Sequence, residues 1–366
     1  MRLFQCIGLG RAYRADFDSR FPAMREAAWA RRLRGLLDDR YGATHILKPV
    51  YDGDPDAFLS FSDDPALLAA WAREHGLAAR APQEVLLAQI ESHRAEVFYC
   101  CDPLTLPSSF VRRLPGCVKK KIAWRAAPVG VADLSAYDVV VSNFQSFRRL
   151  WAAHGWRTAW FSPSWDPETA PYAASAAPRD VDVSFSGSYS RIAGHDTRMA
   201  ILDAVAGIPP PCRIDLRLQR RRWGRLADAA PWRWIPWPNR LPPRLRGLVR
   251  PPVYGRRWYE LLARSRVTLN PAIDITGDER GNMRCWEALG CGTCMVASAG
   301  RYPEGFEPGV HFETFTDAPD ALRVVRRLLA DEARRAAMAR AGAEMVARVW
   351  SKDRQWSDFL RLVDSI

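Results

Sequence analysis

Apolar and polar positions in the first half of the chain alternate between short hydrophobic runs and longer amphipathic segments. The short runs predict strands, and the Ala-, Leu- and Arg-rich segments with apolar residues three or four positions apart predict helices. The predicted strands are 3–7, 44–49, 96–101, 120–124, 139–142 and 158–162, and the predicted helices are 22–41, 65–75, 82–92 and 144–154. Strands that alternate with helices are typical of a parallel sheet with helices on both faces.

A second series of the same kind begins after PYAASAAPRD, residues 171–180, whose Pro, Ala and Ser content is typical of a linker. Its first strand, in VDVSFSGSYS, is predicted to end in a turn at Gly187 and Ser188. The other predicted strands are 213–218, 267–270 and 293–298, and the predicted helices are 197–205, 254–265 and 282–289. A long Ala- and Arg-rich helical region closes the chain.

This pattern predicts an α/β fold with two Rossmann-like domains whose parallel sheets face each other across a cleft. The predicted division is a first domain at 1–172, a linker at 173–179, a second domain at 180–345 and a C-terminal helix, 346–366, that packs back towards the first domain. In open α/β sheets, ligands bind beyond the carboxyl ends of the strands. We therefore expect the working site at those ends.

Composition narrows the class of protein without deciding its function. The 366 residues carry a net charge of +12, which favours polyanionic partners such as nucleotide phosphates, nucleic acid or anionic lipid. The apolar run at the N-terminus is too short for a signal peptide, and no run approaches the ~18 residues of a membrane span. A cytoplasmic protein is therefore expected. Cys285, Cys291 and Cys294 lack a second pair or nearby histidines, so no metal site is expected.

The segment ERGNMRCWEALG, residues 279–290, is the strongest candidate for a binding site. Gly281 permits a tight turn and a close approach of the backbone to a ligand. Asn282, Met283 and Arg284 would form the first turn of a helix, where free amide N–H groups bind anions.

Two glutamates flank this turn. Glu287 would lie on the same face of the helix, where its carboxylate can accept two hydrogen bonds from a ribose diol. Glu279, on the preceding loop, would reach hydroxyls of a sugar beyond a diphosphate. Alternatively, Glu279 is a solvated loop residue and Glu287 a charge on the helix surface.

The segment resembles the Glu-x7-Glu motif of GT-B glycosyltransferases, in particular the family-4-like group and the CgeB-like group with its N-x-R-x-(F/W)-E-A-L-x-x-G signature. The matching residues are Asn282, Arg284, Trp286, Glu287, Ala288, Leu289 and Gly292. The similarity covers most of the chain and is strongest from 253 to 342. It implies transfer of a sugar from a nucleotide-sugar donor, without a cofactor or bound metal.

The resemblance also implies roles for individual residues at the donor site. Glu287 would hold the nucleotide ribose, and Glu279 would contact the donor sugar. Gly281 and Asn282 would present backbone amides to the diphosphate, at the helix start that Met283 and Arg284 continue.

A second set of residues would approach the phosphates from the beginning of the second domain, namely Gly187 and Ser188. Arg191, His195 or Arg198 would stabilise the charge that develops on the departing diphosphate. Family-4-like enzymes usually have an Arg and a Lys at this place. This chain has no Lys there, so the choice among the three residues stays open.

In such enzymes the first domain binds the acceptor, and an inverting enzyme needs a base there. Asp102, directly after the strand at 96–101, is the leading candidate for this base. Weaker candidates are Asp16, Asp18, His45 and His93. A helix cap or an Asx-turn before Pro103 explains Asp102 equally well. Family-4-like enzymes retain anomeric configuration and lack an obvious base, so the stereochemistry stays open.

Arginine and tryptophan are concentrated between 217 and 266, with fourteen Arg against two acidic residues. The Trp residues of this stretch are Trp223, Trp232, Trp234, Trp237 and Trp258. A Pro-ordered loop that packs its own Trp residues is the simplest interpretation. An anionic membrane surface fits nearly as well, and single-stranded nucleic acid fits less well.

The sequence thus predicts a cytoplasmic glycosyltransferase, located in part at the inner face of the membrane. Its acceptor would be a glycan, a lipid-linked glycan or another hydroxyl compound in cell-surface polysaccharide or glycoconjugate synthesis. The alternatives are a GT-B scaffold without transferase activity and a protein that binds nucleic acid or lipid. The sequence does not identify the nucleotide base, the sugar or the acceptor.

Overall fold

The computed structural model describes residues 1–78, 80–188, 196–220, 226, 228, 240–273 and 275–366. The chain forms two compact units: Met1–Ser164 together with Lys352–Ile366, and Trp165–Ser351. These boundaries differ from the predicted ones at 172, 180 and 345. Trp165 and Tyr172 pack on the core of the second unit, and the last helix of the chain packs in the core of the first.

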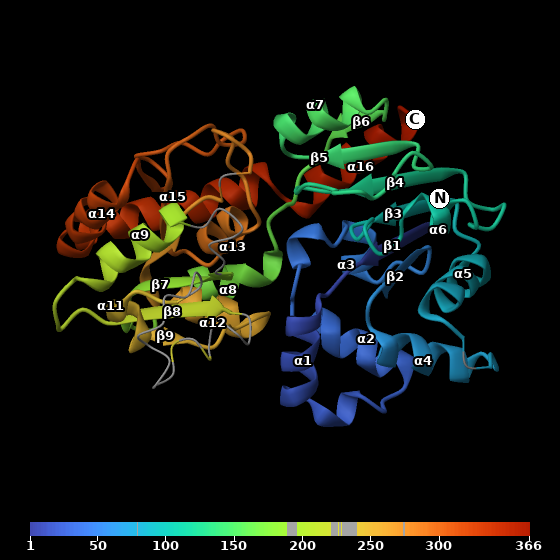
Figure 1. Ribbon diagram of the computed structural model, residues 1–366, viewed down its shortest axis with the longest axis horizontal. Coiled ribbons are helices and arrows are strands. Elements are labelled where there is room, and N and C mark those ends of the chain that lie inside the picture. Colours follow the sequence, from blue (N-terminus) through green and yellow to red (C-terminus); the bar gives the residue numbers. More distant parts are fainter. Residues whose placement is uncertain (79, 189–195, 221–225, 227, 229–239, 274) are drawn as a thin grey trace. The chain divides into compact units, whose positions relative to one another are not determined.

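The first unit is built on a parallel sheet of six strands in the order β2-β1-β3-β4-β5-β6 (Figure 1). The strands are β1 (Leu3–Ile7), β2 (Ala57–Phe61), β3 (Val97–Cys100), β4 (Lys120–Trp124), β5 (Val139–Ser142) and β6 (Thr158–Trp160). The α-helices are α1 (Arg11–Arg20), α2 (Trp29–Asp38), α3 (Lys48–Asp52), α4 (Pro65–Glu74), α5 (Pro82–His93), α6 (Ser108–Val111), α7 (Gln145–Ala153) and α16 (Lys352–Asp364).

Two predicted elements of this unit are wrong. The predicted helix at 22–41 is interrupted, because a 3-10 turn at Pro22–Met24 precedes α2. The predicted strand at 44–49 is a 3-10 turn, Ala43–His45, followed by α3, and the strand beside β1 is β2 instead. The side chain of Gln5 explains the second error. It donates to the His45 carbonyl at 2.7 Å and accepts from the Leu47 amide at 3.1 Å, so this apolar run satisfies its backbone without joining the sheet.

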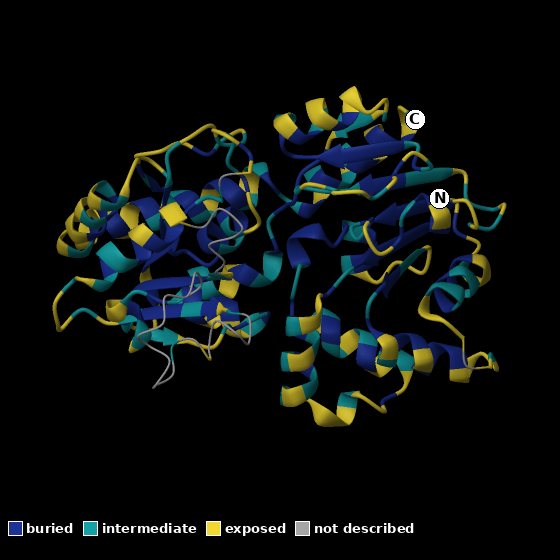
Figure 2. Cartoon of the chain, viewed as in Figure 1, coloured by how far each residue is buried: buried dark blue, intermediate teal, exposed yellow. Residues whose placement is uncertain are grey.

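Alternate residues of the first sheet supply two cores, as expected when both faces of a parallel sheet are covered. Phe4, Phe98 and Val140 lie in one core, and Tyr99 and Val141 lie in the other. Figure 2 shows the central strands of both sheets mainly in the colour of buried residues, with many exposed residues on the helices.

The second unit has its own six-stranded parallel sheet, in the order β12-β11-β10-β7-β8-β9. The strands are β7 (Val181–Ser188), β8 (Ile214–Gln219), β9 (Val249–Arg250), β10 (Ser265–Asn270), β11 (Cys294–Ser298) and β12 (Glu313–Phe315). The described α-helices are α8 (Ala170–Ala173), α9 (Asp196–Ala206), α11 (Pro243–Arg246), α12 (Arg256–Arg264), α13 (Arg284–Gly290), α14 (Ala318–Ala330) and α15 (Glu332–Val349).

Both sheets contain a point at which the strand order reverses. In the first sheet the chain passes from β1 to β2 on one side and continues with β3 on the other side of β1. In the second sheet the reversal lies between β7 and β10. Ligands of doubly wound sheets bind at such switch points, beyond the carboxyl ends of the strands. Within the described ranges, no helix is long and apolar enough to cross a membrane.

Candidate functional site

The switch point of the second sheet is occupied by Arg284, the first residue of α13. Its Nη2 donates to the carbonyl of Ser186 on β7, and its Nη1 lies 3.5 Å from Oδ1 of Asn270 at the end of β10. The start of α13 is therefore joined to the ends of both strands at which the topology reverses.

The loop that leads into α13 is fixed to β10 by a pair of asparagines. Asn270 Nδ2 donates to Asn282 Oδ1 at 3.2 Å, and Asn282 Nδ2 donates to Asn270 Oδ1 at 2.9 Å. Gly281 is buried and has a φ of 135°, which favours glycine. The helix begins at Arg284, two positions after the predicted start, and Asn282 and Met283 are exposed.

The guanidinium of Arg284 lies among aromatic rings and not beside a carboxylate. It is 5.2 Å from the ring centre of Phe185 and 5.5 Å from that of Trp258. No ion pair of Arg284 is formed with any residue in the described part of the chain. Burial lowers the pKa of Arg284, although a guanidinium stays protonated in proteins. No carboxylate of the described residues therefore neutralises this positive charge.

Glu287 lies one turn further along α13 and is half-buried. Its Oε2 accepts a hydrogen bond of 2.9 Å from Nε1 of Trp258 on α12. Burial raises the pKa of Glu287, while the hydrogen bond from Trp258 and the charge of Arg284 lower it. Oε1 accepts no hydrogen bond from the residues described, so this oxygen is available to a ligand.

Glu279 lies on the loop before α13, as predicted from its position in the motif. The loop is closed by hydrogen bonds from the Glu279 amide to the Thr276 carbonyl (3.2 Å) and from the Thr276 hydroxyl to the Glu279 carbonyl (2.9 Å). The backbone of Glu279 also forms an isolated β-bridge with Arg301, three residues after the end of β11. Glu279 and Glu287 thus belong to one loop-and-helix segment, and both are half-buried.

Gly187 and Ser188 do not form the predicted turn. They are the last two residues of β7, where they pair with Leu218 and Gln219 of β8. A methyl group added at Gly187 would lie 2.8 Å from Cζ of Phe185, so this ring is packed against the glycine.

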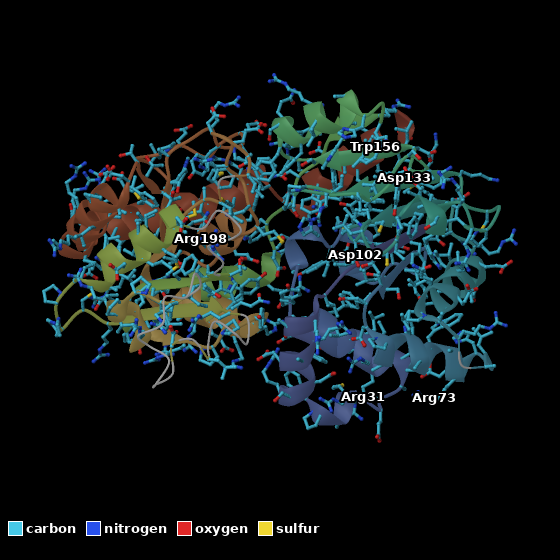
Figure 3. All side chains as sticks on the ribbon, viewed as in Figure 1. Arg31, Arg73, Asp102, Asp133, Trp156 and Arg198 are labelled. Atoms are coloured by element: carbon cyan, nitrogen blue, oxygen red, sulfur yellow. The ribbon has the colours of Figure 1, made fainter. Side chains whose placement is uncertain are left out.

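Of the three predicted cationic residues, only Arg198 lies within the described residues; Arg191 and His195 lie outside them. Arg198 is buried in α9 and is labelled in Figure 3. Its guanidinium donates to the carbonyls of Ser188 and Pro271, each at 3.1 Å. Arg198 thereby bridges the end of β7 and the residue that follows β10.

The switch point of the first sheet brings Asp102 and Ser62 together (Asp102 is labelled in Figure 3). Ser62, which follows β2, donates to Asp102 Oδ2 at 2.5 Å. A methyl group at Gly8, after β1, would lie 2.7 Å from the same oxygen. Burial raises the pKa of Asp102, and hydrogen bonds from Ser62 and Thr105 lower it. Because the Thr105 amide also donates to the Asp102 carbonyl at 3.2 Å, Asp102 closes a local turn as well.

The four weaker candidates for a base are engaged elsewhere in the first unit. Asp16 accepts from Arg20 at 2.8 Å, and Asp18 pairs with the buried Arg32 at 3.0 Å. His45 packs 4.1 Å from the ring centre of Trp124, and burial together with the charge of Lys352 lowers its pKa to about 3. His93 lies 3.2 Å from the carbonyl of Asp56.

The Arg- and Trp-rich stretch is only partly described. Trp258 is 6% exposed and packs in the core of the second unit, so it is not available to a membrane surface. Trp223, Trp232, Trp234 and Trp237 lie outside the described residues. Several of the arginines form ion pairs with aspartates, among them Arg217 with Asp215 (2.6 Å).

Sequence reasoning missed Ser62, Phe185 and Asn270, and it did not connect Trp258 with the candidate site. Ser62 and Asn270 each stand at or just after the carboxyl end of a strand, and that position was a usable signal. Nothing local to Trp258 indicates its partner, because Glu287 is 29 positions further along the chain. Among the residues that the structure describes, no group of three or more His, Cys, Asp or Glu side chains could hold a metal ion.

Comparison with known proteins identifies the fold and gives a family match for part of the chain. Residues 212–361 match the family described as "Glycosyl transferase-like". No curated protein matches the sequence.

Three solved structures are similar to this chain over all or nearly all of both chains. Their sequence identities are low, so the similarity concerns the fold. HepE from Anabaena in complex with UDP is 13% identical, with a TM-score of 0.62 and coverage of 100% of each chain. Sucrose-phosphate synthase from Thermosynechococcus elongatus is 13% identical, with a TM-score of 0.56 over 100% of this chain and 99% of that one. AviGT4, a glycosyltransferase involved in avilamycin A biosynthesis, is 15% identical, with a TM-score of 0.56 over 99% and 96%. With its two six-stranded parallel sheets and these similarities, the chain has the GT-B fold, and residues 212–361 of its second unit and last helix match a glycosyl transferase-like family.

Proposed function

We propose that the protein transfers a sugar from a UDP-sugar to a hydroxyl group of a glycan or lipid-linked acceptor. The choice of nucleotide is supported by the similar fold of HepE, whose structures include complexes with UDP and with UDP-glucose. The acceptor class and a role in surface polysaccharide or glycoconjugate synthesis follow from the resemblance of the motif to the CgeB-like and family-4-like groups.

The observation that carries this proposal is the arrangement of Glu287 and Arg284 on α13. One carboxylate oxygen of Glu287 is held by Trp258, and the other is left for a ligand. Three residues earlier, Arg284 holds a positive charge without a carboxylate partner in the described part of the chain. A nucleotide diphosphate offers the complementary groups, because its ribose diol donates hydrogen bonds and its phosphates are anionic.

In the proposed reaction the bond between the anomeric carbon and the β-phosphate oxygen breaks, and negative charge develops on that oxygen. Arg284 would stabilise this charge on the departing UDP, and Glu279 would contact the hydroxyls of the sugar that is transferred to the acceptor oxygen. The amides of Gly281 and Asn282 and the ends of β7 at Gly187 and Ser188 would complete the donor site. We propose that these protein groups, and not a metal ion, supply the stabilisation.

On the first unit we propose Asp102 as the group that accepts the proton of the acceptor hydroxyl if the reaction inverts configuration. Its position at a switch point, its half-buried carboxylate and its raised pKa support this role. A retaining reaction would leave Asp102 the structural role of closing its turn.

We also propose that the protein acts in the cytoplasm, in part at the inner face of the membrane. The support is compositional, namely the excess of arginine over acidic residues between 217 and 266. The buried Trp258 takes no part in that contact. A nucleic-acid partner is not proposed.

The first test is a thermal-shift panel of UDP, GDP, CMP and ADP, with their sugar conjugates. Wild type is compared with Glu287→Gln and with the control Glu344→Gln on α15, an exposed glutamate without a described partner. A ligand at 100 times its dissociation constant stabilises a protein by about 2.7 kcal/mol, which is easily measured. We expect UDP compounds to stabilise wild type and the control, and to lose most of this effect with Glu287→Gln.

Transfer is tested next by release of UDP from the sugar conjugate that binds, with and without candidate acceptors. No stabilisation by any nucleotide would contradict the proposal and favour a scaffold or a polyanion-binding protein. Equal stabilisation of wild type and Glu287→Gln would be consistent with a nucleotide-binding enzyme but would show that Glu287 does not bind the nucleotide.

A further inference from the structure

Trp258 contacts both charged residues of the candidate donor site. Its indole N–H donates to Glu287 Oε2 at 2.9 Å, and its ring centre lies 5.5 Å from the guanidinium carbon of Arg284. Arg284 and Glu287 are three positions apart on α13, a spacing at which opposite charges often pair. They form no ion pair here.

We propose that Trp258 is the positioning residue of the donor site: it holds the Glu287 carboxylate towards the nucleotide ribose and apart from the Arg284 guanidinium. This inference rests on the proposed function and adds a residue to it.

The chemistry of indole suits this task. The indole nitrogen is a donor only, so it can bind the carboxylate of Glu287 but cannot accept from Arg284. The face of the ring attracts the guanidinium, which gives Arg284 a partner that leaves its charge unneutralised. One side chain therefore satisfies two opposite charges separately. The ribose and the diphosphate of a ligand would then each find an unpaired group.

The position of the indole is itself well fixed. Trp258 is 6% exposed and lies in the first turn of α12. The neighbouring Tyr259 is 1% exposed, and its hydroxyl donates to the buried Asp166 at 3.2 Å. The helix that carries Trp258 is thus anchored directly beside the indole by Tyr259, as a positioning role requires.

The test is the pH dependence of UDP binding, measured by calorimetry on wild type, Trp258→Phe, Glu287→Gln and the double variant. Phenylalanine keeps a ring for Arg284 and removes the N–H donor. A second variant places benzothienylalanine at 258, which replaces the N–H by sulfur and keeps the shape of indole. The control is Trp151→Phe in the first unit, a fully buried Trp whose Nε1 has no hydrogen-bond partner among the described residues.

We expect UDP to bind Trp258→Phe and the benzothienyl variant roughly tenfold more weakly than wild type, as for the loss of one hydrogen bond to a charged group. In both Trp258 variants, the pH below which UDP binding weakens should rise. The indole N–H favours the ionised form of Glu287, so its loss raises the pKa of this carboxyl. In the Glu287→Gln background the Trp258 substitution should add little further loss.

Three results would contradict this inference. Binding and pH profile of both Trp258 variants could match those of Trp151→Phe. The losses from Trp258→Phe and Glu287→Gln could add fully, which would mean that Trp258 acts through packing alone. Failure of wild type to bind any nucleotide would instead overturn the proposed function, and this inference with it.

Discussion

Replacement of Gly187 by alanine tests whether the end of β7 is packed as tightly as the structure shows. The added methyl carbon would lie 2.8 Å from Cζ and 3.3 Å from Cε1 of Phe185. Carbon atoms at an optimal separation are ~3.5–4.0 Å apart, so the ring must move by several tenths of an ångström. Phe185 is fully buried, and the guanidinium groups of Arg198 and Arg284 lie 5.6 Å and 5.2 Å from its ring centre.

Insertion of one methyl group into a close-packed core typically costs about 1–3 kcal/mol. For a unit of this size, each kcal/mol lowers the melting temperature by roughly 2–4 °C, so Gly187→Ala should melt several degrees below wild type. Because the ring contacts Arg284, UDP binding should weaken as well. Both effects have one cause, the displaced ring of Phe185.

The assay is thermal unfolding with and without UDP, and the matched control is Gly247→Ala. Gly247 lies in the same unit, has a φ of −83°, and a methyl group there would meet no atom within 4 Å. The control should melt within about 1 °C of wild type, since surface substitutions usually change stability by less than 0.5 kcal/mol. If Gly187→Ala melts with its control and binds UDP normally, the packing argument is refuted.

The remaining predictions concern protonation and a buried amine. UDP binding should weaken as pH falls through the raised pKa of Glu287, above its ordinary value of 4.5, and calorimetry of Glu287→Gln should show a flat profile over the same range. If Asp102 is the base, Asp102→Asn should lose transfer and keep UDP binding. Ser62→Ala removes a hydrogen bond that lowers the Asp102 pKa, so the pH below which kcat/KM falls should rise. If that pH does not change in Ser62→Ala, Asp102 is not the base. Lys352→Met should destabilise the protein by about 1–3 kcal/mol in urea unfolding, because the carbonyls of Ala43 and Ile46 lose a buried donor; unchanged stability would show that water replaces the amine.

Strands could be predicted from the sequence where an apolar run lies between segments with helix-like periodicity. The strands at the centre of the second sheet, β10 and β11, begin and end within two residues of their predicted bounds. The run at 44–49 is also predicted as a strand, yet it does not enter the first sheet, because Gln5 on β1 satisfies backbone groups of His45 and Leu47. Such a side-chain contact leaves no mark in local periodicity.

The candidate site divides in the same way. Glu287 and Arg284 could be selected because the segment around them is contiguous and carries a recognisable pattern. Trp258 could not, because its role depends on the fold bringing α12 beside α13. Arg198 has the residue type expected of a phosphate ligand, but its guanidinium is directed to the carbonyls of Ser188 and Pro271. Residue type alone does not distinguish these two uses of an arginine.

The return of α16 to the first unit has a consequence for synthesis on the ribosome. Phe359 of α16 is fully buried against Tyr99 and Phe161, so the first sheet lacks part of its core until α16 is made. Domains usually fold in the order in which they emerge. Here the second unit, which ends at Ser351, can be completed before the first. A nascent chain halted before Lys352 should therefore resist protease in its second unit and be cleaved in its first.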